Sequence, residues 1–327
     1  MKKMFGLMLS AVMLIGLSGP ISPVDADTLR IGAHRSLWGS MEIVADKMGY
    51  WKELGLKYKV GHYKQGKLMR NAIIQGNLDT GTTGFSPFVG AVSKGAKVQS
   101  IGVTANICGA ISIMVLKKAK GTTLADFKGT FANKKGTSTD FAFQQYVLPA
   151  YGFKSSDFPL LSVRATERIA ALITGNAKAA MVGEPQSTIA ESAGKVRRLE
   201  NLCKYDKTRM MHIGNPKTIK NKPELYVKYF KGWLKGQQLL KNNPDKYAEV
   251  YTQALQARGD KAKLKDMKKV VRKLKSEPFV TAEVKNYLND MAAKQKKLGW
   301  IKKHPDFTNI PMVDDSILRK VAKGMNY

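Results

Sequence analysis

Two turns of the chain combine glycine with hydroxyl side chains, a combination suited to binding small anions. The first turn contains Thr83, Gly84, Phe85 and Ser86, and the second contains Gly136, Thr137, Ser138 and Thr139. Where such a turn opens a helix, the free backbone N–H groups and the positive end of the helix dipole attract an anion, and the hydroxyls add hydrogen bonds. The alternative is N-capping, in which each hydroxyl bonds only its own helix.

A third turn adds side chains of other kinds. It contains His34, Arg35, Ser36 and Trp38. Arg35 can pair bidentately with a sulfonate or carboxylate, and His34 can donate a hydrogen bond to a ligand. Trp38 and Phe85 suit either stacking on a planar ligand or core packing. Asn106, just after a predicted strand, is a further polar candidate, while Arg35 at the rim and His34 within the turn can equally have structural roles.

A fourth turn, Gly183 and Glu184, carries a negative charge. A carboxylate in an anion site repels the ligand, so Glu184 needs another explanation. It either caps its own helix, which the helix dipole favours, or pairs with a cationic or N–H-bearing group of the ligand. The second possibility predicts a small organic ligand with two chemical faces.

The first and fourth turns end two similar segments, residues 73–84 and 172–183, which lie 99 residues apart. Each segment predicts the end of an apolar-faced helix, a Gly-Asn stop, a short strand, a second glycine and a helix opened near proline. A unit repeated in each half indicates two similar α/β lobes. Turns after strands form the usual ligand site of such lobes, so we expect the four turns to meet across a cleft.

Strands and helices alternate along most of the chain, which predicts mostly parallel sheets with helices on both faces. We expect strands at 28–32, 56–63, 80–83, 98–105, 110–116, 130–132, 160–163, 179–182, 196–202 and 210–213. We expect helices at 40–54, 66–75, 85–93, 123–127, 138–151, 166–174 and 186–193, and then at 223–241, 244–258, 264–275, 281–298 and 311–320. The aromatic stripe from Tyr226 to Trp233 has helical spacing and predicts core packing.

The first 26 residues predict a secretory signal peptide, because a basic start and an apolar run at 4–17 precede small residues near Ala26. An uncleaved anchor is the alternative. We therefore expect an exported protein, whose 327 residues, 43% apolar, suffice for two lobes. Export permits a disulfide between the two cysteines, Cys108 and Cys203, although two half-buried thiols are an equal possibility.

The chain has 55 Lys and Arg against 25 Asp and Glu, a net charge of +30. A nucleic-acid surface, attraction to an anionic membrane or ligand, and a solvated helix face are the possible explanations. No nucleic-acid motif accompanies the charge, and lysine dominates over arginine, which favours the solvated face. The four histidines lack metal-ligand spacing, and no phosphate-binding or nucleophile-elbow motif is present, so neither a metal nor a cofactor is predicted.

Several segments, in order, resemble the periplasmic substrate-binding proteins for nitrate, sulfonate, taurine and related compounds. They are 29–32 (LRIG), 49–56 (GYWKELGL), 76–84 (GNLDTGTTG), 123–129 (TLADFKG) and 183–185 (GEP). The resemblance implies a two-lobed, type II binding protein that closes on a ligand and delivers it to an ABC importer. It implies a monomer, with lobe I from residues 27–109 and 210–327, lobe II from 110–209, and a hinge at the two crossings. Lys178 departs from the family, which usually has Asp there.

The same resemblance leaves other functions open. Some proteins of this architecture are enzymes, among them a desulfinase with a cysteine nucleophile; here that role would fall to Cys108, with His34 as the base. A receptor for a sensor kinase is a third class of function. Relatives bind sulfonates, nitrate, bicarbonate, pyrimidines or flavins, and the polar turns do not distinguish these ligands.

Overall fold

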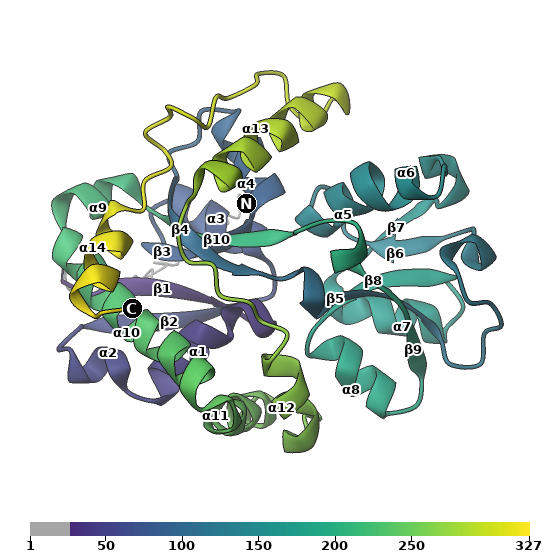
Figure 1. Ribbon diagram of the computed structural model, residues 1–327, viewed down its shortest axis with the longest axis horizontal. Helices are drawn as coiled ribbons and strands as arrows, with labels where there is room; N and C mark the ends of the chain where they lie inside the picture. Colours follow the sequence, from purple (N-terminus) through teal and green to yellow (C-terminus); the bar gives the residue numbers. More distant parts are fainter. Residues whose placement is uncertain (1–26) are drawn as a thin grey trace, which may run out of the picture.

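The computed structural model describes residues 27–327, so the predicted signal peptide, residues 1–26, lies outside the described part. The chain forms two five-stranded sheets flanked by helices (Figure 1). The first sheet has the order β2-β1-β3-β10-β4, formed by Leu29–His34 (β1), Tyr58–Tyr63 (β2), Thr80–Gly84 (β3), Gln99–Asn106 (β4) and Arg209–Gly214 (β10). The second has the order β7-β6-β8-β5-β9, formed by Ile111–Leu116 (β5), Phe131–Asn133 (β6), Leu160–Ser162 (β7), Ala179–Gly183 (β8) and Val196–Asn201 (β9).

Each sheet contains one strand that runs against the other four. In the first sheet it is β10, antiparallel to both β3 and β4, and in the second it is β5, antiparallel to both β8 and β9. These are the strands by which the chain enters a sheet from the other one. The remaining strands end at the cleft, whereas a strand arriving from the opposite lobe starts there, so its direction is reversed. The predicted two-lobed α/β architecture is confirmed.

Helices cover both sheets, and most lie where the sequence predicts. Those of the first half are Ser40–Lys47 (α1), Tyr50–Glu53 (α2), Gly66–Ile74 (α3) and Phe85–Val92 (α4). The middle of the chain contributes Ser138–Ala142 (α5), a π-helical segment Phe143–Val147, Leu148–Ala150 (α6), Arg168–Ile173 (α7) and Gln186–Ser192 (α8). The single helix predicted over 40–54 is two helices, because Gly49 adopts a left-handed conformation (φ 72°) between them.

The last third of the chain is helical. It contains Pro216–Asn221 (α9), Pro223–Asn242 (α10), Pro244–Ala257 (α11), Leu264–Val271 (α12), Ala282–Lys297 (α13) and Ser316–Gly324 (α14). Helix α9 was not predicted, and two other helices have shifted bounds. Helix α12 ends at Val271 because the chain then turns to place Lys275 beside Asn106 on β4, and α14 spans Ser316–Gly324 where 311–320 was predicted. No helix within residues 27–327 has both the length and the apolar character to cross a membrane.

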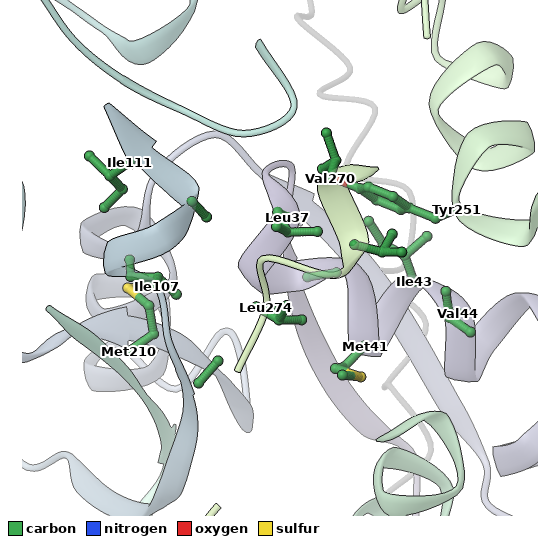
Figure 2. Packing of buried hydrophobic residues seen from close by; sticks show 14 of the residues in the cluster. Leu37, Met41, Ile43, Val44, Ile107, Ile111, Met210, Tyr251, Val270 and Leu274 are labelled. Atoms are coloured by element: carbon green, nitrogen blue, oxygen red, sulfur yellow. The ribbon is translucent and has the colours of Figure 1, made fainter. Parts of the chain in front are cut away.

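Helix α10 buries its aromatic stripe in the core of the first lobe, as predicted. Tyr226, Tyr229, Phe230 and Trp233 are all fully buried. The ring of Trp51 packs against Gly232, where a Cβ atom would lie only 2.2 Å from the indole. The same core cluster continues to the crossings, since it includes Ile107, Ile111 and Met210 together with Leu37 (Figure 2). The cluster also includes Phe131 and Met181 of the second sheet, so one apolar core runs from the first lobe through the hinge into the second.

The two crossings between the sheets have similar local sequences. Strand β4 ends in Asn106, followed by Ile107 and Cys108, and β9 ends in Asn201, followed by Leu202 and Cys203. In each, the Asn side-chain oxygen accepts the backbone N–H of the cysteine two residues on, at 3.2 Å in the first and 3.0 Å in the second. The matched turns place the two cysteines together, with their Cα atoms 4.7 Å apart, and they form a disulfide.

The sequence left open whether Cys108 and Cys203 are bonded. In the structure they form a disulfide, which joins the two crossings covalently. Asn201 adds a second tie, because its side-chain N–H groups donate to the carbonyls of Gly109 and Ile111 in the other crossing, at 3.1 and 3.2 Å. Strands β5–β9 all lie between these two crossings. The five strands of the second sheet thus all come from residues 111–201.

Candidate functional site

A cleft between the two lobes encloses about 830 Å³, including its open mouth. Residues from both lobes line it, and eight of them belong to the four predicted turns. These eight are His34, Ser36, Trp38, Gly84, Thr137, Ser138, Thr139 and Gly183. The structure therefore brings residues from all four turns together at one place, between the ends of β1, β3, β6 and β8.

The other seven predicted site residues do not line this cleft. They are Arg35, Thr83, Phe85, Ser86, Asn106, Gly136 and Glu184. Arg35 is exposed, and Phe85 is fully buried in the core, where its ring meets the edge of Tyr287. Asn106 orients the hinge turn instead of facing a ligand. Only some residues of a turn that opens a helix can face a ligand. The seven residues named here lie on other sides of their turns.

Of the remaining residues, Thr83 is buried in its strand, whereas Ser86 and Gly136 line a neighbouring hollow. The Thr83 hydroxyl has no hydrogen-bond partner among residues 27–327. Ser86 accepts hydrogen bonds from the Gln295 side chain, and Gly136 donates its N–H to Asp140. Thr137 caps α5 by accepting the N–H of Asp140 at 3.2 Å. Hydroxyl capping, the simpler reading of these turns, thus accounts for at least Thr137, although this residue also faces the cleft.

Glu184 is removed from the cleft by its own partners. Its carboxylate is fully buried and accepts hydrogen bonds from Arg198 at 2.8 Å, Lys273 at 2.5 Å and Thr188. Burial alone would raise the pKa of this carboxyl, but Arg198 and Lys273 outweigh burial and hold the pKa below its usual value. The N–H of Thr188 also bonds this carboxylate, so Glu184 caps its own helix. The expectation that Glu184 pairs with a cationic group of the ligand therefore has no support in this geometry.

Arg168 is the most important lining residue that the sequence reasoning missed. It opens α7 and is only 6% exposed, yet it lines the cleft. One guanidinium nitrogen donates to the carbonyl of Met181 at 2.7 Å, while its Nε has no partner among the described residues. Burial lowers the pKa of Arg168 to about 10, so the group stays charged at neutral pH. A buried, incompletely paired guanidinium beside a cleft is a strong attraction for an oxyanion.

The internal repeat contains the signal that would have found it. Positions 99 residues apart line the cleft in pairs: Gly66 with Ala165, Gly84 with Gly183, and Pro87 with Gln186. The same spacing relates Met69, which is buried in the first lobe, to Arg168 in the second. Comparing the two copies over a longer stretch would have shown an arginine in place of an apolar residue next to the predicted site.

The cleft has a cationic part and an apolar part. Its charged lining residues are Lys64, Lys67, Lys134 and Arg168, and no Asp or Glu lines it within residues 27–327. The apolar surface comes from Trp38, Ile107, Ile111, Val182 and Met210. The indole N–H of Trp38 is buried without a partner among the described residues. The site can therefore hold an anionic group and a short apolar group at once, with the Trp38 N–H as an additional donor. The Thr137 and Thr139 hydroxyls already donate to the Lys134 carbonyl and to the Asn133 side chain.

His34 supplies a neutral donor to this cleft. Its Nδ1 accepts the backbone N–H of Ser36 at 3.1 Å, and the Ser36 hydroxyl lies 2.5 Å from the same nitrogen. Because Nδ1 is an acceptor, the ring proton lies on Nε2. Burial, reinforced by the charge of Arg258, lowers the pKa of His34 to about 3. The ring is therefore neutral at physiological pH.

Contacts across the cleft hold the two lobes close together. The N–H of Ser86 donates to the Ser138 hydroxyl at 3.2 Å, and the N–H of Leu37 donates to the Glu184 carbonyl at 3.1 Å. Gly183 lies against the Trp38 ring, where a Cβ atom would be 2.7 Å from the nearest ring carbon. The lobes thus meet through backbone groups and glycines, which permit a closer approach than larger residues would allow.

Gly84 provides a test of this close approach. A Cβ atom at this position would lie 2.3 Å from the Ser138 hydroxyl oxygen, although the backbone there (φ −72°, ψ 156°) suits any residue. We expect Gly84→Ala to weaken ligand binding roughly tenfold by holding the lobes apart, a change of about 1.4 kcal/mol, measured by isothermal titration calorimetry.

Ser138→Gly provides the matched background for this test, because it removes the atoms that the new methyl group would strike. In that background the added alanine should cost nothing, and a double-mutant cycle measures the difference. An equal loss in both backgrounds would show that the methyl group acts by some route other than Ser138.

The available chemistry gives no support to a catalytic cysteine. Cys108 is bonded to Cys203, so its sulfur is not a free thiolate. Within the part of the chain that the structure describes, no three His, Cys, Asp or Glu side chains gather in a metal-binding group.

Comparisons with known proteins agree with this architecture. The family model described as "NMT1/THI5 like" matches residues 40–247, which is more than half of the chain. The "Putative aliphatic sulfonates-binding protein" of Escherichia coli (strain K12) is 24% identical over 214 residues, covering 65% of this chain and 67% of that protein.

Among solved structures, the fold is similar to the alkanesulfonate-binding protein SsuA from Xanthomonas axonopodis pv. citri bound to MOPS. The TM-score is 0.76 at 19% identity, covering 89% of this chain and 99% of the other. The periplasmic nitrate-binding protein NrtA from Synechocystis PCC 6803 gives a TM-score of 0.74 at 13% identity, covering 91% and 89%. The resemblance found in the sequence motifs is confirmed: this chain belongs to the NMT1/THI5-like family and has the fold of the substrate-binding proteins of ABC transport.

Proposed function

We propose that this protein is an extracytoplasmic receptor that binds an organic sulfonate in the interlobe cleft and delivers it to an ABC importer. The observation that carries the proposal is the buried Arg168, whose guanidinium faces a cleft without a lining carboxylate. A sulfonate oxygen can accept from this guanidinium and from the hydroxyl of Ser138, which also lines the cleft. The sulfonate- and alkanesulfonate-binding relatives support the same class of ligand.

The rest of the lining favours an organic anion over a bare oxyanion or a zwitterion. Trp38, Ile107 and Met210 provide apolar contact that nitrate does not need. Taurine carries an ammonium group, and Glu184, the acid nearest to the four turns in sequence, is already paired with Arg198 and Lys273. An unpaired ammonium in the cleft would lose its hydration without a counter-charge. The ligand is therefore expected to be an alkanesulfonate with a short apolar chain.

Calorimetric titration of the mature protein with a ligand panel tests the proposal. The panel contains alkanesulfonates from one to six carbons, the matching carboxylates, taurine and nitrate. We expect affinity to rise with chain length among the sulfonates and to be at least tenfold weaker for taurine and nitrate, a difference of about 1.4 kcal/mol. A heterocycle such as a pyrimidine binding more tightly than every sulfonate would overturn the assignment.

A further inference from the structure

Basic residues face one another where the two lobes meet at the cleft. Lys64 and Lys67 belong to the loop and helix after β2 in the first lobe, and Lys134 and Lys135 belong to the loop after β6 in the second. The Lys67 ammonium reaches across and donates to the backbone carbonyl of Lys135 at 3.0 Å. Closure of the lobes therefore places an ammonium of one lobe directly on a lysine-bearing loop of the other.

A second hollow beside the ligand cleft continues this arrangement. It also spans both lobes and shares Lys67 and Pro87 with the ligand cleft. Its charged lining residues are Lys67, Arg70, Lys94 and Lys135, all of them basic. The positive charge therefore surrounds the interlobe junction on both sides of Lys67.

One buried carboxylate acts against this charge. Asp140 attracts both Lys67 and Lys135, and it is almost fully buried, where it accepts hydrogen bonds from Gly136 and Gln144. Asp140 also interacts with the buried Arg168. Burial lowers the pKa of Lys67, and the neighbouring charges of Arg70 and Lys134 act in the same direction, as expected for an ammonium pressed against like charges.

We propose that Lys67, Lys134 and Lys135 make closure conditional on an anion, so that the protein selects its ligand by net charge when the lobes close. The proposal rests on the function proposed above. In the empty protein, like charges repel as the lobes approach, and the effect grows as water leaves the cleft. A bound sulfonate supplies the missing counter-charge to both lobes. A neutral ligand of the same shape gains the apolar contacts of the closed state but leaves the repulsion in place, so it shifts the equilibrium less than the sulfonate does.

Small-angle X-ray scattering of the empty mature protein tests directly whether repulsion between the lysines of the two lobes keeps the lobes apart. Wild type at low ionic strength should have a larger radius of gyration than wild type with hexanesulfonate. High ionic strength, where the screening length falls to about 3 Å at 1 M salt, should move the empty protein toward the compact value. Lys134→Gln/Lys135→Gln should be shifted toward that value at low salt. The control Lys302→Gln/Lys303→Gln removes the same charge from exposed positions that line neither hollow, and should scatter like wild type.

Hexyl methyl sulfone provides the ligand arm, because it keeps an apolar chain and a sulfonyl group but carries no charge. It should leave wild type expanded at concentrations where hexanesulfonate compacts it. The proposal is overturned if empty wild type is already compact at low salt, if the 134/135 variant scatters like wild type, or if the sulfone compacts wild type as well as the sulfonate does. If hexanesulfonate does not bind, the proposed function fails. The comparison of the empty proteins at low and high salt still decides whether the lysines hold the lobes apart.

Discussion

Replacing Arg168 with methionine should weaken hexanesulfonate binding about 30-fold or more. The substitution keeps an unbranched side chain that covers the apolar contacts of the arginine stem, but it removes the buried guanidinium that lines the cleft. Truncating one partner of a buried charge pair costs about 2–5 kcal/mol, and each 1.4 kcal/mol is a factor of ten. Calorimetric titration at fixed ionic strength measures the change.

Arg164→Met is the matched control. Arg164 lies four residues earlier in the same segment, is exposed, pairs with Glu167 and does not line the cleft. Its removal should change affinity less than twofold, within the range of about 0–1 kcal/mol typical of exposed ion pairs. Equal losses in the two variants would mean that the segment as a whole, and not the buried charge, supports binding. Unchanged affinity in Arg168→Met would remove the central support for an anionic ligand.

Removing the hinge disulfide should have the largest effect on stability. The bond joins residues 95 apart in sequence, and a cross-link over so long a loop restricts the unfolded chain strongly. We expect Cys108→Ser/Cys203→Ser to lower the free energy of unfolding by about 2–5 kcal/mol, measured by urea denaturation followed by circular dichroism.

The reduced wild-type protein is the control for this measurement, since it keeps both sulfur atoms but lacks the bond. It should unfold at nearly the same urea concentration as the double variant. If the oxidised wild type is no more stable than either, the matched Asn turns of the two crossings hold the hinge by themselves, and the disulfide adds little.

The sequence predicted most of the fold because its signals were local. Glycine stops, alternating strands and the aromatic spacing of α10 depend on neighbours only a few residues away. The repeat also predicted correctly that residues such as Gly84 and Gly183 would meet at one cleft. The split of the first long helix at Gly49 was missed, although a glycine at that point was visible.

The site was harder to predict because its residues depend on distant partners. Glu184 is neutralised in part by Lys273, 89 positions along the chain, and nothing in the local turn indicates that contact. Phe85 enters the core because Tyr287 lies over it. Arg168 resembles an ordinary surface residue at the start of a helix, and only its burial shows otherwise. Local patterns locate the turns, whereas long-range packing decides which side chains face the ligand.

The paired crossings also constrain the order in which the molecule can be completed. Strand β4 has β10 as its only neighbour in the first sheet, and β10 begins six residues after Cys203. Neither the disulfide nor the pairing of β4 can form until every residue of strands β5–β9 has been synthesised. The first sheet begins with the amino-terminal strands, but it is completed by β10, which comes after all five strands of the second sheet. Once the two crossings are joined, residues 108–203 form a covalent ring in which a single backbone cut releases no fragment.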